Sequence, residues 1–101
     1  MHLTQILLPL YDGHGRRITR TAFAEVRETL MQRFGGVTAY TQAPAEGAWH
    51  VRGKTDRDSI ITFEVMSKKA DARWWKTYKE ELEARFHQEW IVVRSMRCTL
   101  R

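Results

Sequence analysis

The chain has 101 residues, 43% of them hydrophobic and 29% charged, which predicts a single globular domain over residues 1–101. The net charge of +5 permits an anionic ligand or a nucleic acid as partner, although a solvated basic surface is the commoner cause of such a charge. No apolar run approaches the roughly 18 residues of a membrane span, and the N-terminus has no pattern of a secretory leader, so we expect a cytoplasmic protein without a membrane partner.

The sequence contains no pattern typical of a metal or cofactor site. Cys98 is the one cysteine, so no internal disulfide is expected, and the four histidines lack the spacing to other ligand residues that zinc sites show. Residues 13–17 precede a predicted helix, where anions bind readily, but their glycine spacing matches neither a Walker loop nor a dinucleotide loop. We therefore expect no metal and no cofactor, and treat residues 13–17 as a weak anion site.

The first third of the chain predicts a strand and a helix. Residues 3–10 form a short apolar run that ends at turn residues, as a buried strand does. Residues 21–34 carry a helical stripe whose apolar members recur at intervals of three or four: Phe23, Val26, Leu30 and Phe34. Thr19 or Thr21 is the expected N-cap, and Glu25 is expected in the first turn.

Three strands are expected in the middle of the chain. Residues 37–41 and 48–52 are rich in β-branched and aromatic residues and are joined by a turn that contains Pro44. Residues 59–66 form the clearest alternating strand. One of its faces carries Ile61, Phe63 and Val65, and the other carries Ile60, Thr62, Glu64 and Met66.

The last third again predicts a helix and a strand. Residues 71–86 carry a second stripe with the same spacing, made by Trp75, Tyr78, Leu82 and Phe86. Asp71 is the expected N-cap of this helix. Residues 90–96 alternate in the manner of a strand.

The order β-α-β-β-β-α-β is that of a ferredoxin-like α+β sandwich with a hairpin elaboration in the middle. It predicts an antiparallel sheet with two helices on one face. The predicted strands 3–10, 59–66 and 90–96 are nonetheless apolar on both sides, so the helix-free face would expose an apolar patch unless something covers it. We expect a homodimer packed sheet to sheet, as in the dimeric α+β barrels; the alternative is a monomer whose middle hairpin folds over this face.

Four short motifs resemble those of an uncharacterised family of small bacterial proteins of unknown function. They are Phe34-Gly35-Gly36-Val37-Thr38, Gly47-Ala48-Trp49, Glu64-Val65 and Phe86-His87-Gln88-Glu89. The resemblance covers most of the chain. It implies a ferredoxin-like fold in a bacterial protein and implies no activity.

Glu64 and His50 are the candidate catalytic residues. Glu64 is predicted on the helix-free face, where burial by a partner would raise its pKa and suit it to act as a general base, unless Arg94 pairs with it. His50 has the neutral-range pKa of an acid–base group. The alternatives, a structural ion pair for Glu64 and a surface position for His50, are the commoner cases.

Aromatic side chains supply most of the candidate ligand-binding residues. Tyr40 and Trp49 lie on the predicted middle hairpin, where they are free to line a pocket, and their polar edges need partners if buried. Trp90 and Arg94, from the last strand, complete the set. The aromatic residues at helical spacing are expected in the core instead.

Three functions are ranked on this basis. The first is a homodimer that binds a small molecule on the helix-free face, with a cofactor-independent enzyme as its catalytic form. The second is a non-catalytic interaction or scaffold protein. The last is a single-stranded nucleic-acid binder that stacks bases on Tyr40 and Trp49, because this function needs the open face that sheet-to-sheet dimerisation would remove.

Overall fold

The structure, a computed structural model, describes residues 1–42 and 60–101. Its elements follow in the order β1 (His2–Pro9), α1 (Arg20–Phe34), β2 (Thr38–Gln42), β3 (Ile60–Ser67), α2 (Ala72–Arg85) and β4 (Val92–Arg97). These elements confirm the predicted ones, with ends shifted by one or two residues. The predicted strand at 48–52, which contains Trp49 and His50, lies outside the described residues. Within those residues, no helix is both long enough and apolar enough to span a bilayer.

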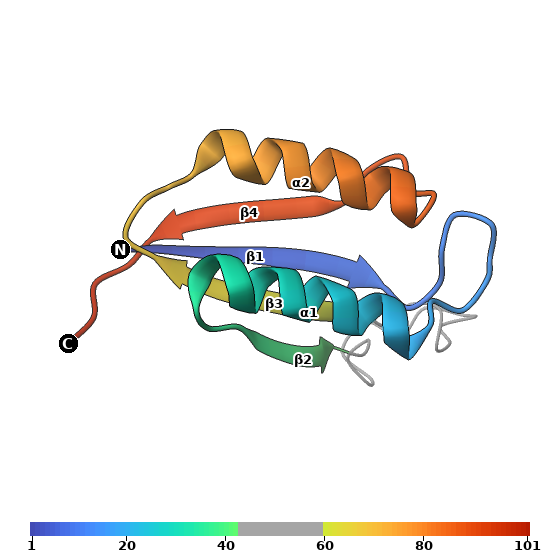
Figure 1. Ribbon diagram of the computed structural model, residues 1–101, viewed down its shortest axis with the longest axis horizontal. Coiled ribbons are helices and arrows are strands. Elements are labelled where there is room, and N and C mark those ends of the chain that lie inside the picture. Colours follow the sequence, from blue (N-terminus) through green and yellow to red (C-terminus); the bar gives the residue numbers. More distant parts are fainter. Residues whose placement is uncertain (43–59) are drawn as a thin grey trace, which may run out of the picture.

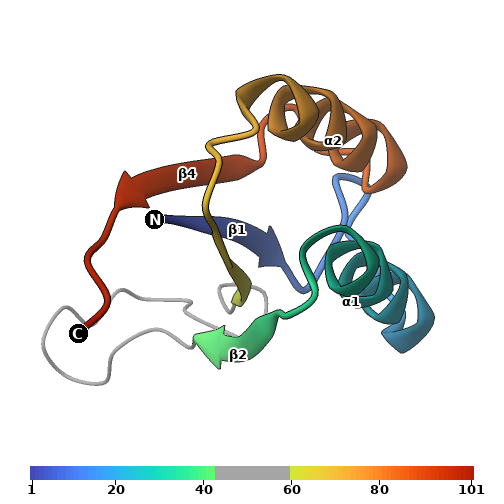
Figure 2. The ribbon, with the colours of Figure 1, turned by 60° about the vertical axis from the view of Figure 1, so that its left-hand side comes forward.

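The four strands form one antiparallel sheet in the order β2-β3-β1-β4. Strand β1 pairs along its whole length with β3, from His2 opposite Ser67 to Pro9 opposite Ile60. Because β1 and β2 both run antiparallel to β3, they point the same way with β3 between them. Both helices lie on one side of this sheet (Figures 1 and 2). The protein is therefore a small α+β domain with one helix-covered and one helix-free face.

Helix α1 begins at a threonine cap and ends at a glycine. Thr19 is the N-cap, and its Oγ1 accepts a hydrogen bond from the Ala22 amide at 3.1 Å. Glu25 consequently falls beyond the first turn, so its predicted first-turn position is wrong. Gly35 ends the helix with a φ of 80° and donates to the Met31 carbonyl at 2.8 Å, a conformation that residues with a Cβ adopt only with strain.

Asp71 is the N-cap residue of α2, as predicted, but its side chain does not cap the helix. Its backbone is left-handed, with φ 51° and ψ 40°, and its side chain makes no capping hydrogen bond. The carboxylate instead lies 3.7 Å from Arg33 Nη2, which ties the start of α2 to the end of α1. The N-cap position of Asp71 is confirmed, while the side-chain capping bond is absent because such a bond needs an extended backbone at this position.

The core lies between the helices and one face of the sheet. Both predicted helical stripes face it, with Val26 and Leu30 buried on α1 and Trp75, Tyr78 and Leu82 buried on α2. Residues Ile6, Leu8, Phe63 and Val65 of the sheet pack against them. Burial of each such side chain contributes roughly 1.5–3 kcal/mol to folding. The predicted face assignment of residues 59–66 is thereby confirmed, since Met66 on the opposite face is 47% exposed.

Candidate functional site

The helix-free face carries alternate residues of all four strands. One row across the sheet is polar and consists of Thr38, Glu64, Gln5 and Arg94. This set is called the polar row below. The next row is apolar and consists of Met66, Leu3 and Met96. On the other side, Leu7 pairs with Thr62 and Val92, so the polar row crosses a mostly apolar surface.

A chain of hydrogen bonds runs along the polar row. Arg94 Nε donates to Gln5 Oε1 at 2.7 Å, and Gln5 Nε2 donates to Glu64 Oε1 at 2.6 Å. The Tyr40 hydroxyl, two residues beyond Thr38 on β2, donates to the same Glu64 oxygen at 2.9 Å. The sheet fixes the spacing of these groups because each comes from a different strand.

Gln5 joins a cation to an anion and is only 8% exposed. Its amide has one orientation, since a guanidinium can only donate and an ionised carboxylate can only accept. Among the ion pairs of the described residues, none joins Arg94 to Glu64 directly. The predicted contact between these two residues is thus replaced by an indirect one through the Gln5 amide.

Tyr40 is a hydrogen-bond donor to Glu64 at neutral pH. The bond to Glu64 raises the pKa of the Tyr40 hydroxyl, because the carboxylate favours the protonated phenol over the phenolate, and partial desolvation acts in the same direction. The positive charge of Arg94 acts in the opposite direction. Tyr40 therefore lies within the electrostatic reach of both charged groups.

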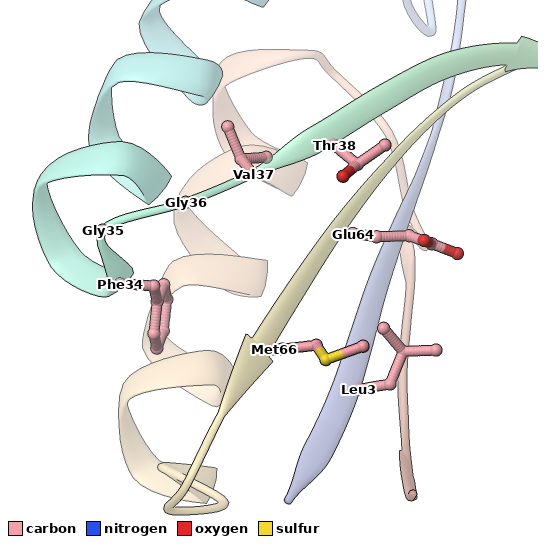
Figure 3. A pocket seen from close by; sticks show the side chains of 8 residues that line it. All are labelled: Leu3, Phe34, Gly35, Gly36, Val37, Thr38, Glu64 and Met66. Carbon is pink, nitrogen blue, oxygen red and sulfur yellow. The ribbon is translucent and has the colours of Figure 1, made fainter. Parts of the chain in front are cut away.

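Glu64 lines a cavity of about 530 Å³ at the edge of the polar row (Figure 3). The other walls are Leu3, Met66 and the segment that runs from the end of α1 through the α1–β2 connection to the start of β2: Phe34, Gly35, Gly36, Val37 and Thr38. Figure 3 shows Glu64 and Met66 pointing to the same side of β3, where Leu3 of β1 also lies. Glu64 Oε1 accepts two hydrogen bonds, whereas Oε2 has no partner in the described part of the chain. One carboxylate oxygen is thus left for a ligand.

The α1–β2 connection offers bare backbone to this cavity. Apart from each glycine and its two chain neighbours, no heavy atom lies within 4 Å of the position that a Cβ would take at Gly35 or at Gly36. The space beside these glycines is therefore open. A flat or bulky part of a ligand can approach the backbone closely here.

The structure brings some predicted site residues together and separates others. Glu64, Tyr40 and Arg94 meet at the polar row. Trp90 does not reach the polar row. It precedes the first residue of β4, its side chain is 70% exposed, and its ring centroid lies 3.7 Å from Lys79 Nζ on α2. His50 and Trp49 lie outside the described residues. Gln5 is not singled out by the sequence pattern, although a polar residue in the apolar run 3–10 is a signal that could have found it.

Backbone amides in the loop at residues 13–17 donate hydrogen bonds to a side chain of the chain itself. Asp12 Oδ1 accepts hydrogen bonds from the amides of His14 and Arg16, at 2.8 and 2.9 Å. The bond from Arg16 is the main cause of the lowered pKa of the Asp12 carboxyl. The predicted weak anion site is therefore occupied by a carboxylate of the chain itself. Across residues 1–42 and 60–101, no group of three or more His, Cys, Asp or Glu side chains is arranged to hold a metal ion.

No protein-family model matches the chain, and no curated protein sequence is significantly similar to it. Among solved structures, a phage SAM lyase in complex with S-methyl-5'-thioadenosine is similar, with a TM-score of 0.62 over 94% of this chain and 79% of that chain. The sequence identity is 15%. At this identity the likeness concerns the fold alone. The resemblance to a family of small bacterial proteins stays a prediction.

Proposed function

We propose that the protein binds a small cationic molecule at Glu64, in the cavity on the helix-free face. The observation that carries the proposal is the state of the Glu64 carboxylate. Two donors hold Oε1 in place, and Oε2 is left without a described partner beside the cavity. A carboxylate fixed in this way is a preorganised acceptor for a cation, and such charge-assisted contacts are the strong ones.

S-adenosylmethionine is the ligand that we propose first. It carries a sulfonium cation, which a carboxylate attracts, and a nucleoside of a size suited to the cavity. The cavity volume of about 530 Å³ falls within the range of roughly 300–1,000 Å³ that small-molecule sites occupy. The similar fold of a phage SAM lyase supports the choice. Because the sequence predicts no cofactor, Glu64 is the candidate general base of a cofactor-independent enzyme.

We infer that the fold is ferredoxin-like and related to the dimeric α+β barrels. Read from its other edge, the sheet order is β4-β1-β3-β2. Helix α1 then connects β1 to β2, with β3 lying between these two strands. Helix α2 connects β3 to β4, with β1 lying between them. This is the split βαβ arrangement. Strand directions support this, since every neighbouring pair is antiparallel.

A second copy of the chain is the proposed cover of the helix-free face. Large apolar side chains are exposed there, with Met66 and Met96 each 47% and Val92 37% exposed. The hydrogen bonds of the polar row are made within one chain, so a partner could cover that row without breaking them. A cytoplasmic location is part of the same proposal.

The second candidate function is a non-catalytic interaction protein, which the exposed apolar rows beside the polar row also favour. It differs from the first in predicting no small ligand at Glu64. Binding of single-stranded nucleic acid ranks last, because it requires this face to stay open.

Calorimetric titration with S-adenosylmethionine and with the neutral thioether S-methyl-5'-thioadenosine tests the proposal. Glu64→Gln keeps the shape of the side chain and removes its charge, so we expect at least tenfold weaker binding of the sulfonium and a much smaller change for the thioether. Glu28→Gln, which changes an exposed carboxylate on α1, is the matched control and should bind as the unmodified protein does. Absence of saturable binding of both nucleosides would contradict the proposal.

A further inference from the structure

We propose that Arg94 completes the site as the clamp for a ligand carboxylate, so that the site selects a dipolar molecule with its cation at Glu64 and its carboxylate at Arg94. The inference rests on the proposed function, and it adds the class of ligand and a residue that determines specificity. Glu64 and Arg94 belong to the same row, on the strands that flank β1, and both lie on the helix-free face. Glu64 lines the cavity and Arg94 does not, so the ligand would extend from the cavity along the polar row to reach Arg94.

Arg94 has unused donors that suit a carboxylate. Its Nε is held by Gln5 Oε1 at 2.7 Å, while its terminal nitrogens have no hydrogen-bond or ion-pair partner among the described residues. A guanidinium carries five N–H donors in a planar fork, which matches the two oxygens of a carboxylate. Because Gln5 already orients the side chain, less conformational freedom is lost when a ligand binds.

The separation of the two charges is set by one amide group. Gln5 contacts Arg94 at 2.7 Å and Glu64 at 2.6 Å, so the guanidinium and the carboxylate stand on either side of its amide without touching. Neither charge is neutralised by direct contact with the other. Each is therefore available to the oppositely charged end of one small molecule.

This arrangement discriminates against ligands that carry one charge. A simple cation at Glu64 would feel the repulsion of Arg94 across the Gln5 amide, and a simple anion at Arg94 would feel that of Glu64. One amide group separates the two charges, at 2.7 Å from Arg94 and 2.6 Å from Glu64, so each lies close to a ligand bound at the other. A dipolar ligand turns both interactions into attractions, which gives selectivity through repulsion of the alternatives.

The alternative role of Arg94 is to hold Gln5 in place without touching a ligand. The two roles differ in their dependence on the ligand carboxylate. S-adenosylmethionine and its decarboxylated form both carry the sulfonium, but only the first has a carboxylate. A clamp predicts that a change at Arg94 weakens binding of the first ligand selectively, whereas a purely structural role predicts equal weakening of both.

The experiment is calorimetric titration of both ligands into the unmodified protein, Arg94→Gln, Arg94→Lys and the control Arg97→Gln. Arg97 lies on the same strand but opposite His2, on the other face of the sheet. We expect at least tenfold preference for the carboxylated ligand in the unmodified protein and in the control. Arg94→Gln should lose this preference, because the carboxylated ligand binds more weakly while the decarboxylated ligand, freed from the repulsion of Arg94, binds equally well or more tightly. Arg94→Lys should retain part of the preference, because lysine keeps the charge without the fork.

Two results overturn the inference in distinguishable ways. Equal losses for both ligands in Arg94→Gln, with Glu64→Gln still weakening the sulfonium, remove the clamp and leave the proposed function standing. Absence of binding of either sulfonium to the unmodified protein removes the proposed function and the clamp together. Thermal unfolding of each variant, expected within a few degrees of the unmodified protein, excludes misfolding as the cause.

Discussion

Gln5 shows how a single neutral side chain can organise two charged ones. It is nearly buried, and it takes a hydrogen bond from Arg94 while giving one to Glu64. An unpaired buried amide would destabilise the fold by about 1–3 kcal/mol, so its position between two partners is also what makes its burial tolerable. The site geometry thus follows from satisfying one polar group in an otherwise apolar strand.

Tyr40 offers a direct measure of this geometry at the scale of one residue. Its pKa is raised by Glu64, so it should titrate above the ordinary tyrosine value, and Glu64→Gln should return it towards that value. Because the pKa is higher in the folded state, the stability that the Tyr40–Glu64 bond contributes is fully present below the unfolded pKa and is lost as the pH rises through the folded one.

The titration can be followed by NMR of ring-labelled tyrosine, with the Tyr40 signal assigned by its absence from Tyr40→Phe. Denaturant unfolding of the unmodified protein and Tyr40→Phe should show a stability difference at neutral pH that shrinks in strongly alkaline solution. A Tyr40 signal that titrates identically with and without the Glu64 carboxylate would contradict the hydrogen bond.

At the scale of the elements, the α1–β2 connection combines a helix end with a cavity wall. Gly35→Ala should destabilise the protein by roughly 1–2 kcal/mol, because alanine must then adopt the left-handed backbone that glycine has there, at a φ of 80°. Gly36→Ala is the matched control, since Gly36 has no positive φ and no neighbour within 4 Å of a new Cβ. Urea unfolding measures both, and equal stability of the two variants would contradict the role given to Gly35.

Periodicity predicts the elements, while contacts between elements decide their ends. The stripes on both helices follow from spacing alone, which local sequence displays directly. The start of β4 does not, because the Ile91 amide donates to the Glu83 carboxylate of α2 at 2.9 Å and the strand begins only after it. A contact between elements also decides the start of α2, since the Asp71 carboxylate pairs with Arg33 of α1 rather than with the first amides of α2.

The neighbours of Glu64 in the polar row could not be predicted from the sequence, for a related reason. Alternation assigns Glu64 to the helix-free face, but its neighbours depend on the pairing offsets of β1 with β3 and with β4. A slip of one residue in either pairing would turn that strand's side chains to the other face. The register that places Gln5 between Glu64 and Arg94 is therefore a property of the assembled sheet.

At the scale of the whole molecule, the two faces of the sheet differ in what covers them. The helices bury one face, and the other presents Met66 and Met96 on either side of Leu3 in the row beside the polar row. If a second copy covers this face, light scattering behind size exclusion should give about twice the chain mass of 11.9 kDa. A charge in the apolar row should then separate the copies, because it would be buried without a partner.

Met66→Lys and Met96→Lys are suited to this test, since both side chains are exposed in the single chain and their replacement should leave its thermal stability nearly unchanged. Met31→Lys, on α1 and 41% exposed, introduces the same charge away from the face and should remain a dimer. A monomer at every concentration of the unmodified protein would contradict sheet-to-sheet packing. Leu3 and Met66 of the apolar row also line the cavity, so a second copy on this row would cover the cavity, and dissociation should weaken ligand binding together with assembly.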